Sequence, residues 1–88
     1  MKHITVFHQP NCQPCRLTMK MIDKLGLAYD ERSLTDGSPE SALALSNAKA
    51  LGMTSAPLVE VRDDSGALVR TLSGYRPAEL REIAGVAH

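Results

Sequence analysis

Cys12 and Cys15 stand where a strand pattern gives way to a helical pattern. Residues 2–8 are rich in β-branched and aromatic side chains, and Pro10 ends any strand soon after them. Residues 13–25 follow a helical period, with apolar positions on one side: Leu17, Met21, Ile22 and Leu25. The junction therefore predicts a strand, a short loop and a helix whose first turn holds both cysteines.

The rest of the chain continues this alternation of strands and helices. Gly26 ends the first helix, and Ser38 with Pro39 has the pattern of a helix N-cap followed by the first helical residue. The later elements are a strand over 27–33 or 27–34, a helix from Pro39 closed by Gly52, strands over 58–62 and 67–72 joined by a turn at 63–66, and a helix over 77–84. The apolar sides are predicted as Ala42, Leu43, Leu45, Ala48 and Leu51 for the second helix, and Leu80, Ile83 and Ala84 for the last.

The element order β-α-β-α-β-β-α limits the fold class. A strand–helix–strand start implies a right-handed crossover and a parallel strand pair, and the later hairpin adds an antiparallel pair. We expect an α/β fold with a four-stranded mixed sheet and helices on both faces. The 88 residues, 1–88, fit one domain.

Composition excludes several classes of function. Ten basic and ten acidic residues give a net charge of zero, and the aromatic residues are few, which argues against nucleic-acid binding. The apolar runs are far shorter than the roughly 20 residues that cross a bilayer, and the N-terminus lacks a signal-peptide pattern. We therefore expect a cytoplasmic protein that does not bind a membrane.

The spacing of Cys12 and Cys15 favours redox chemistry. At the helix N-cap, the Cys12 sulfur would face unsatisfied backbone N–H groups, which stabilise a thiolate and make Cys12 the nucleophile. Cys15, one turn later, could then attack a mixed disulfide on Cys12 and release the substrate. Two alternatives remain: a metal site, which lacks a second pair of Cys or His ligands, and an inert buried pair.

Three segments resemble the glutaredoxin family and, within it, the NrdH-type redoxins. They are Phe7-His8-Gln9-Pro10-Asn11-Cys12-Gln13-Pro14-Cys15, Thr54-Ser55-Ala56-Pro57 and Ser73-Gly74-Tyr75-Arg76-Pro77. The resemblance implies a thioredoxin fold of the glutaredoxin-like type. It also implies a protein disulfide reductase without a bound cofactor, a monomer that carries electrons from thioredoxin reductase to class Ib ribonucleotide reductase through a Cys12/Cys15 disulfide.

The resemblance also assigns substrate-binding residues. Pro57 matches the cis-proline beside the cysteine pair, where a cis bond would expose the backbone of Ala56 to an extended substrate. The segment Ser73, Gly74, Tyr75 and Arg76 matches an SGFRP motif, with Tyr75 in place of Phe. Arg76 stands where glutathione-using glutaredoxins carry an acidic residue, so glutathione should bind weakly.

Two positions depart from the family pattern. Leu72 replaces a frequent Trp, which would remove an aromatic surface patch and change the partner. Gln9 replaces a common cation, which leaves the helix terminus, or Arg16, to favour the Cys12 thiolate. The competing functions are a glutathione-dependent glutaredoxin and a non-catalytic metal-binding module.

Overall fold

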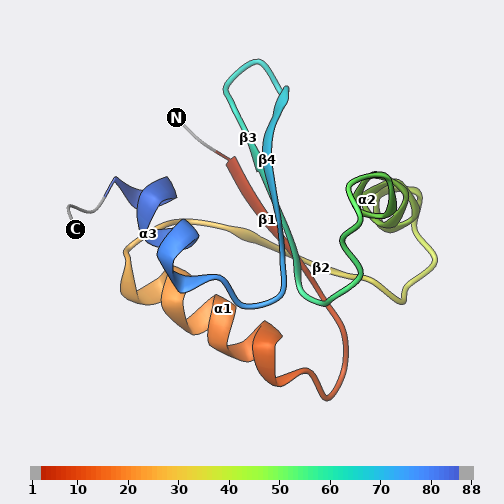
Figure 1. Ribbon diagram of the computed structural model, residues 1–88, viewed down its shortest axis with the longest axis horizontal. Coiled ribbons are helices and arrows are strands. Elements are labelled where there is room, and N and C mark those ends of the chain that lie inside the picture. Colours follow the sequence, from red (N-terminus) through yellow and green to blue (C-terminus); the bar gives the residue numbers. More distant parts are fainter. Residues whose placement is uncertain (1–2, 86–88) are drawn as a thin grey trace.

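The computed structural model describes residues 3–85 and confirms the predicted order of elements (Figure 1). The strands are β1 (His3–His8), β2 (Asp30–Ser33), β3 (Leu58–Arg62) and β4 (Leu68–Ser73), and the helices are α1 (Gln13–Lys24), α2 (Pro39–Ala50) and α3 (Pro77–Ala84). The largest difference in bounds is at β2, which begins at Asp30 rather than at Leu27. Lys2, the predicted start of the first strand, lies outside the described residues.

The four strands form one mixed sheet in the order β2-β1-β3-β4. β1 pairs in parallel with β2, while β3 is antiparallel to both β1 and β4, as predicted. Phe7 of β1 pairs with Leu58 of β3, and Leu58 pairs with Ser73 of β4. The end of β1, the start of β3 and the end of β4 therefore meet at one end of the sheet.

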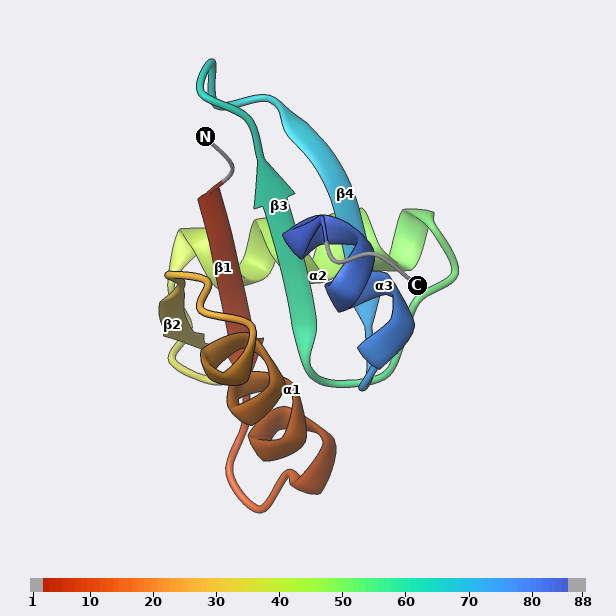
Figure 2. The ribbon, with the colours of Figure 1, turned by 90° about the vertical axis from the view of Figure 1, so that its left-hand side faces the viewer.

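The helices cover both faces of this sheet. Figure 2 shows α1 and α3 in front of the sheet and α2 behind it. The larger core cluster lies under α1 and α3: Ile4, Val6, Ile22, Val59, Val61, Leu72, Leu80 and Ile83. The smaller cluster lies under α2: Phe7, Ala44, Ala48 and Leu58. Among residues 3–85, no helix has the length and apolar character of a membrane span.

The buried side of α1 agrees with the predicted one except at Leu17. Cys15, Thr18 and Ile22 are the buried residues of this helix, whereas Leu17 is 38% exposed. Ile22 is buried and Met21 and Leu25 pack against the core cluster, as predicted, so the prediction was wrong only at Leu17.

The predicted apolar side of α2 is wrong except at Ala48, which is buried as expected. Ser38 caps the helix by accepting a hydrogen bond from the Ser41 N–H at 3.2 Å, as expected. The buried residues are nevertheless Ser41, Ala44 and Ala48, while the leucines of the predicted side are exposed: Leu43, Leu45 and Leu51. Small side chains let α2 lie close to the sheet, where Phe7 and Leu58 supply the apolar bulk.

Candidate active site

Cys12 occupies the N-cap of α1. Its backbone is extended, with φ −111° and ψ 103°, and its Sγ accepts a hydrogen bond from the Cys15 N–H at 3.1 Å. The first turn, Gln13 to Arg16, carries no acidic residue that would oppose the positive end of the helix dipole. This local geometry is the one that favours a thiolate on Cys12 once the pair is reduced.

Cys12 and Cys15 form a disulfide, with their Cα atoms 5.2 Å apart. Cys12 is 7% exposed and Cys15 only 1%, so Cys12 is the more exposed of the two cysteines. The Thr18 hydroxyl donates to the Pro14 carbonyl at 2.8 Å and ties the first turn to the second. In this arrangement Cys12 can react with a substrate disulfide, and the buried Cys15 can then react with Cys12.

The loop before β3 runs past the cysteine end of the sheet. Its Ala56–Pro57 bond is cis, as the resemblance implied, and Pro57 is buried. Within residues 3–85, neither the N–H nor the carbonyl of Ala56 makes a hydrogen bond. The backbone of Ala56 can therefore pair with an extended peptide.

Ser73 and Gly74 hold this cis-proline loop in place. The Ser73 hydroxyl accepts from the Ser55 N–H at 3.0 Å and donates to the Ser55 carbonyl at 2.7 Å. The Gly74 N–H donates to the Pro57 carbonyl at 2.9 Å, from a backbone with φ +78° that suits glycine. Because Ser73 is 7% exposed and its hydroxyl is engaged, its geometry fits positioning of the loop rather than direct contact with substrate.

Tyr75 and Arg76 complete the segment between β4 and α3. Arg76 is exposed, and its Nε donates to the Ser73 carbonyl at 3.0 Å, which fixes a cation close to the cis-proline loop. Tyr75 is half-buried and lies against the exposed side of α1, beside Leu17 and Met21. Tyr75 therefore lies next to α1, and Arg76 next to the end of β4.

Leu72 and Gln9, the two positions that depart from the family pattern, lie in different environments. Leu72 is 2% exposed and belongs to the core, so the expected loss of a surface patch at this position is wrong. Gln9 is exposed on the loop after β1. Arg16 donates to the Gln13 side chain at 3.4 Å, and no contact joins its guanidinium to a cysteine sulfur in the described chain.

A pocket next to the cis-proline loop adds residues that the sequence did not single out as site residues. It lies between Ala56 of the loop, Gln9 and α2, from which Leu45 and Lys49 contribute. The sequence predicts Leu45 on the packed side of its helix, so it gives no indication that this side chain lines a pocket. Among residues 3–85, no group of three or more His, Cys, Asp or Glu side chains could hold a metal ion.

Comparison with known proteins decides the family. No protein-family model matches the chain. The glutaredoxin-like protein NrdH of Lactococcus lactis subsp. lactis (strain IL1403) is 30% identical over 81 residues, which cover 92% of this chain and 99% of that protein. The chain belongs to the glutaredoxin-like NrdH family.

Two further comparisons agree with this placement. The structure of the NrdH-redoxin from Escherichia coli matches with a TM-score of 0.69 and 26% identity, over 92% of this chain and 93% of that one. The SPbeta prophage-derived thioredoxin-like protein YosR of Bacillus subtilis (strain 168) is 27% identical over 85% of each chain. The protein is thus an NrdH-like thiol-disulfide redoxin with the thioredoxin-like fold and a Cys-x-x-Cys disulfide.

Proposed function

We propose that this protein is a dithiol electron carrier that reduces disulfides of an acceptor protein. The observation that carries the proposal is the Cys12–Cys15 disulfide at the start of α1, in which Cys12 holds the N-cap and is the more exposed of the two cysteines. The redox equivalents reside in these two side chains, so the reaction needs no bound cofactor. Cys12 is the nucleophile and Cys15 the resolving cysteine.

The exchange proceeds in two balanced steps. The Cys12 thiolate attacks one sulfur of the acceptor disulfide; a mixed disulfide forms, the acceptor S–S bond breaks, and the other acceptor sulfur leaves as a thiolate that takes up a proton. Cys15 then loses its proton and attacks Cys12 Sγ, which forms the Cys12–Cys15 bond and releases the second acceptor thiolate. Two electrons pass to the acceptor, and a reductase must return them.

The backbone around the cis bond positions the acceptor. A segment that pairs with the free N–H and carbonyl of Ala56 would lie extended across the cysteine end of the sheet. Ser73 and Gly74 keep Ser55 and Pro57 fixed on either side of Ala56. In this proposal Pro57 and Ala56 contact the substrate, while Ser73 and Gly74 position them.

The electron donor is thioredoxin reductase and the acceptor is class Ib ribonucleotide reductase. Membership in the NrdH family supports this pair, and the E. coli relative is described as a glutaredoxin-like protein with a thioredoxin-like activity profile. Tyr75 and Arg76 would contribute to partner binding from the exposed segment before α3. The protein would work in the cytoplasm as a monomer and as a single domain.

A glutathione-dependent glutaredoxin is the second candidate function. The geometry argues against it, because Arg76 is held by the Ser73 carbonyl next to the cis-proline loop. A cation there opposes the ammonium group of glutathione. Gln9 likewise offers no charge to a glutathione carboxylate.

The test supplies NADPH with either thioredoxin reductase or glutathione plus glutathione reductase, and follows NADPH loss while a disulfide substrate is reduced. We expect turnover with thioredoxin reductase and little with the glutathione system. The Cys12→Ser variant should be inactive in both. Turnover confined to the glutathione arm would refute the proposed donor.

A further inference from the structure

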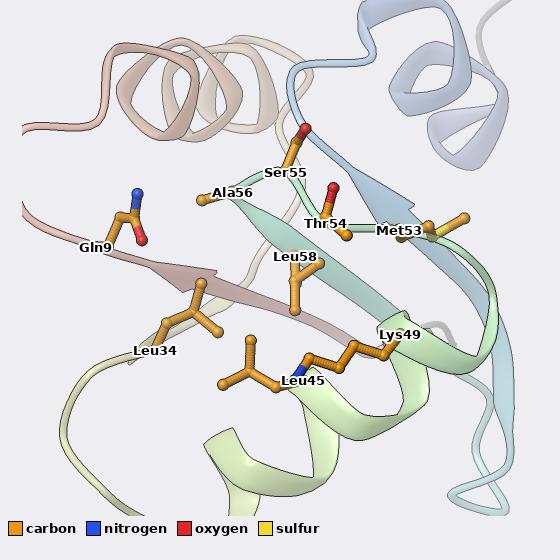
Figure 3. Close-up of a pocket in the computed structure, with 9 residues that line it drawn as sticks. All are labelled: Gln9, Leu34, Leu45, Lys49, Met53, Thr54, Ser55, Ala56 and Leu58. Atoms are coloured by element: carbon orange, nitrogen blue, oxygen red, sulfur yellow. The ribbon is translucent and has the colours of Figure 1, made fainter.

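A pocket of about 170 Å³ opens beside the cis-proline loop (Figure 3). Leu34, Leu45 and Leu58 come from three separate parts of the chain, and Figure 3 shows their side chains pointing toward one another. The volume suits one apolar side chain rather than a cofactor, since ligand pockets usually measure about 300–1,000 Å³. Burial of an apolar group against these leucines is favourable in proportion to the area removed from water.

The charged group of this pocket is a cation. Lys49 is exposed in the last turn of α2, and its side chain makes no ion pair or hydrogen bond within residues 3–85. Figure 3 shows its side chain along α2, one turn from Leu45. No acidic residue lines the pocket within the described chain, so its charge is complementary to a carboxylate.

The pocket adjoins the backbone that can bind an extended segment. Ala56 lines it, and the free N–H and carbonyl of Ala56 lie in the same loop. In an extended segment alternate side chains point to the same side, so pairing at Ala56 would direct one side chain toward the pocket and the next away. Backbone pairing would supply affinity, and the pocket would supply selectivity.

We infer that this pocket selects the acceptor segment by taking one of its apolar side chains, while Lys49 pairs with a carboxylate of the same segment. This inference rests on the proposed reduction of a protein disulfide and specifies its substrate class: an extended, acidic segment with an apolar residue next to the disulfide. Lys49 and Leu45 are then specificity residues, separate from the two cysteines that carry out the exchange.

The test compares three disulfide peptides of equal length. The first carries Leu and Glu beside its disulfide, the second replaces Glu by Lys, and the third replaces Leu by Ser. The protein is reduced chemically, freed from reductant and mixed with each peptide, and the rate of reduction is measured in a single turnover. We expect the first peptide to react about threefold faster than the second, as a partly exposed ion pair allows. It should react about tenfold faster than the third, because the pocket buries the leucine.

Two variants with matched controls assign the selectivity. Lys49→Glu should reverse the preference for Glu over Lys, whereas Lys24→Glu, the same charge change on α1, should leave it intact. Leu45→Ser should reduce the preference for Leu over Ser, whereas Leu43→Ser, on the same helix but outside this pocket, should not. The two control variants, Lys24→Glu and Leu43→Ser, should also reduce the small uncharged hydroxyethyl disulfide at the wild-type rate.

An unchanged peptide ranking in Lys49→Glu and Leu45→Ser would overturn the inference, as would an equal slowing on every disulfide. An effect confined to oxidised glutathione would also overturn it, because glutathione would then be the occupant. The peptide ranking does not involve a reductase. Failure of the proposed electron-carrier role would appear separately, as absent NADPH consumption with thioredoxin reductase.

Discussion

Replacement of Ser73 by Ala removes the hydroxyl that links β4 to the cis-proline loop. Ser73 Oγ accepts from the Ser55 N–H at 3.0 Å and donates to the Ser55 carbonyl at 2.7 Å. A neutral hydrogen bond contributes about 0.5–1.5 kcal/mol net, and Ser55 is exposed enough for water to replace part of the loss. We expect the free energy of unfolding to fall by about 1–2 kcal/mol.

Urea unfolding followed by circular dichroism measures this change. The midpoint should fall with little change in slope, and the melting temperature should fall by roughly 4–8 °C for each kcal/mol lost. Ser46→Ala is the matched control: Ser46 is exposed on α2 and its hydroxyl makes no hydrogen bond in the described chain, so this variant should be at least as stable as the wild type.

The same variant tests whether the loop is positioned by Ser73. Folded Ser73→Ala protein should reduce a protein disulfide more slowly, because Ala56 is presented less well, while its rate on a small disulfide stays close to that of the wild type. A Ser73→Ala protein with wild-type stability and wild-type rates on protein disulfides would refute the reasoning.

Three further predictions concern the sulfurs. After reduction, Cys12 should be alkylated first at neutral pH, with Cys15 protected behind it, and mass spectrometry that finds equal labelling would contradict the assigned roles. Cys15→Ser should accumulate a stable mixed disulfide between Cys12 and the acceptor, visible on a non-reducing gel, and release of the acceptor at the wild-type rate would show that another group resolves it. The midpoint potential should lie within about 40 mV of the thioredoxin value of about −270 mV, because a donor in a reducing cytosol needs a stable disulfide form. A titration against dithiothreitol that gives a value above about −180 mV would indicate an oxidant or isomerase instead.

Local signals in the sequence were sufficient for the element order and for the cysteine site. Pro10 stops the first strand, Gly26 follows the first helix, and Ser38 caps the second, each through backbone chemistry that depends on near neighbours. The N-cap position of Cys12 followed from the same junction. Such features need no knowledge of distant residues.

The buried side of α2 could not be found in this way. Apolar residues occur all round this helix, so hydrophobic periodicity does not select a face, and the choice depends on space above the sheet. Phe7 and Leu58 occupy that space, and the small side chains of Ala44 and Ala48 pack against them. The leucines that remain outside include Leu45, which lines the pocket.

Contacts between residues far apart in the sequence explain the other differences between the predicted and the observed structure. β2 begins at Asp30 because it forms where β1 offers a partner, from Thr5 onward. The Ser73 hydroxyl forms its hydrogen bonds with Ser55, which lies 18 residues earlier in the chain, so no local sequence pattern predicts them. Leu72 is buried because its strand faces α1 and α3, which a comparison with the family motif does not show.

Reconstitution of the complete electron path tests the central claim most directly. The assay combines NADPH, thioredoxin reductase, this protein and a class Ib ribonucleotide reductase, and measures deoxyribonucleotide formed against NADPH consumed. The account predicts one deoxyribonucleotide for each NADPH, dependence on this protein, and no product with Cys12→Ser. Product that forms without this protein, or only when glutathione and glutathione reductase replace thioredoxin reductase, would contradict it.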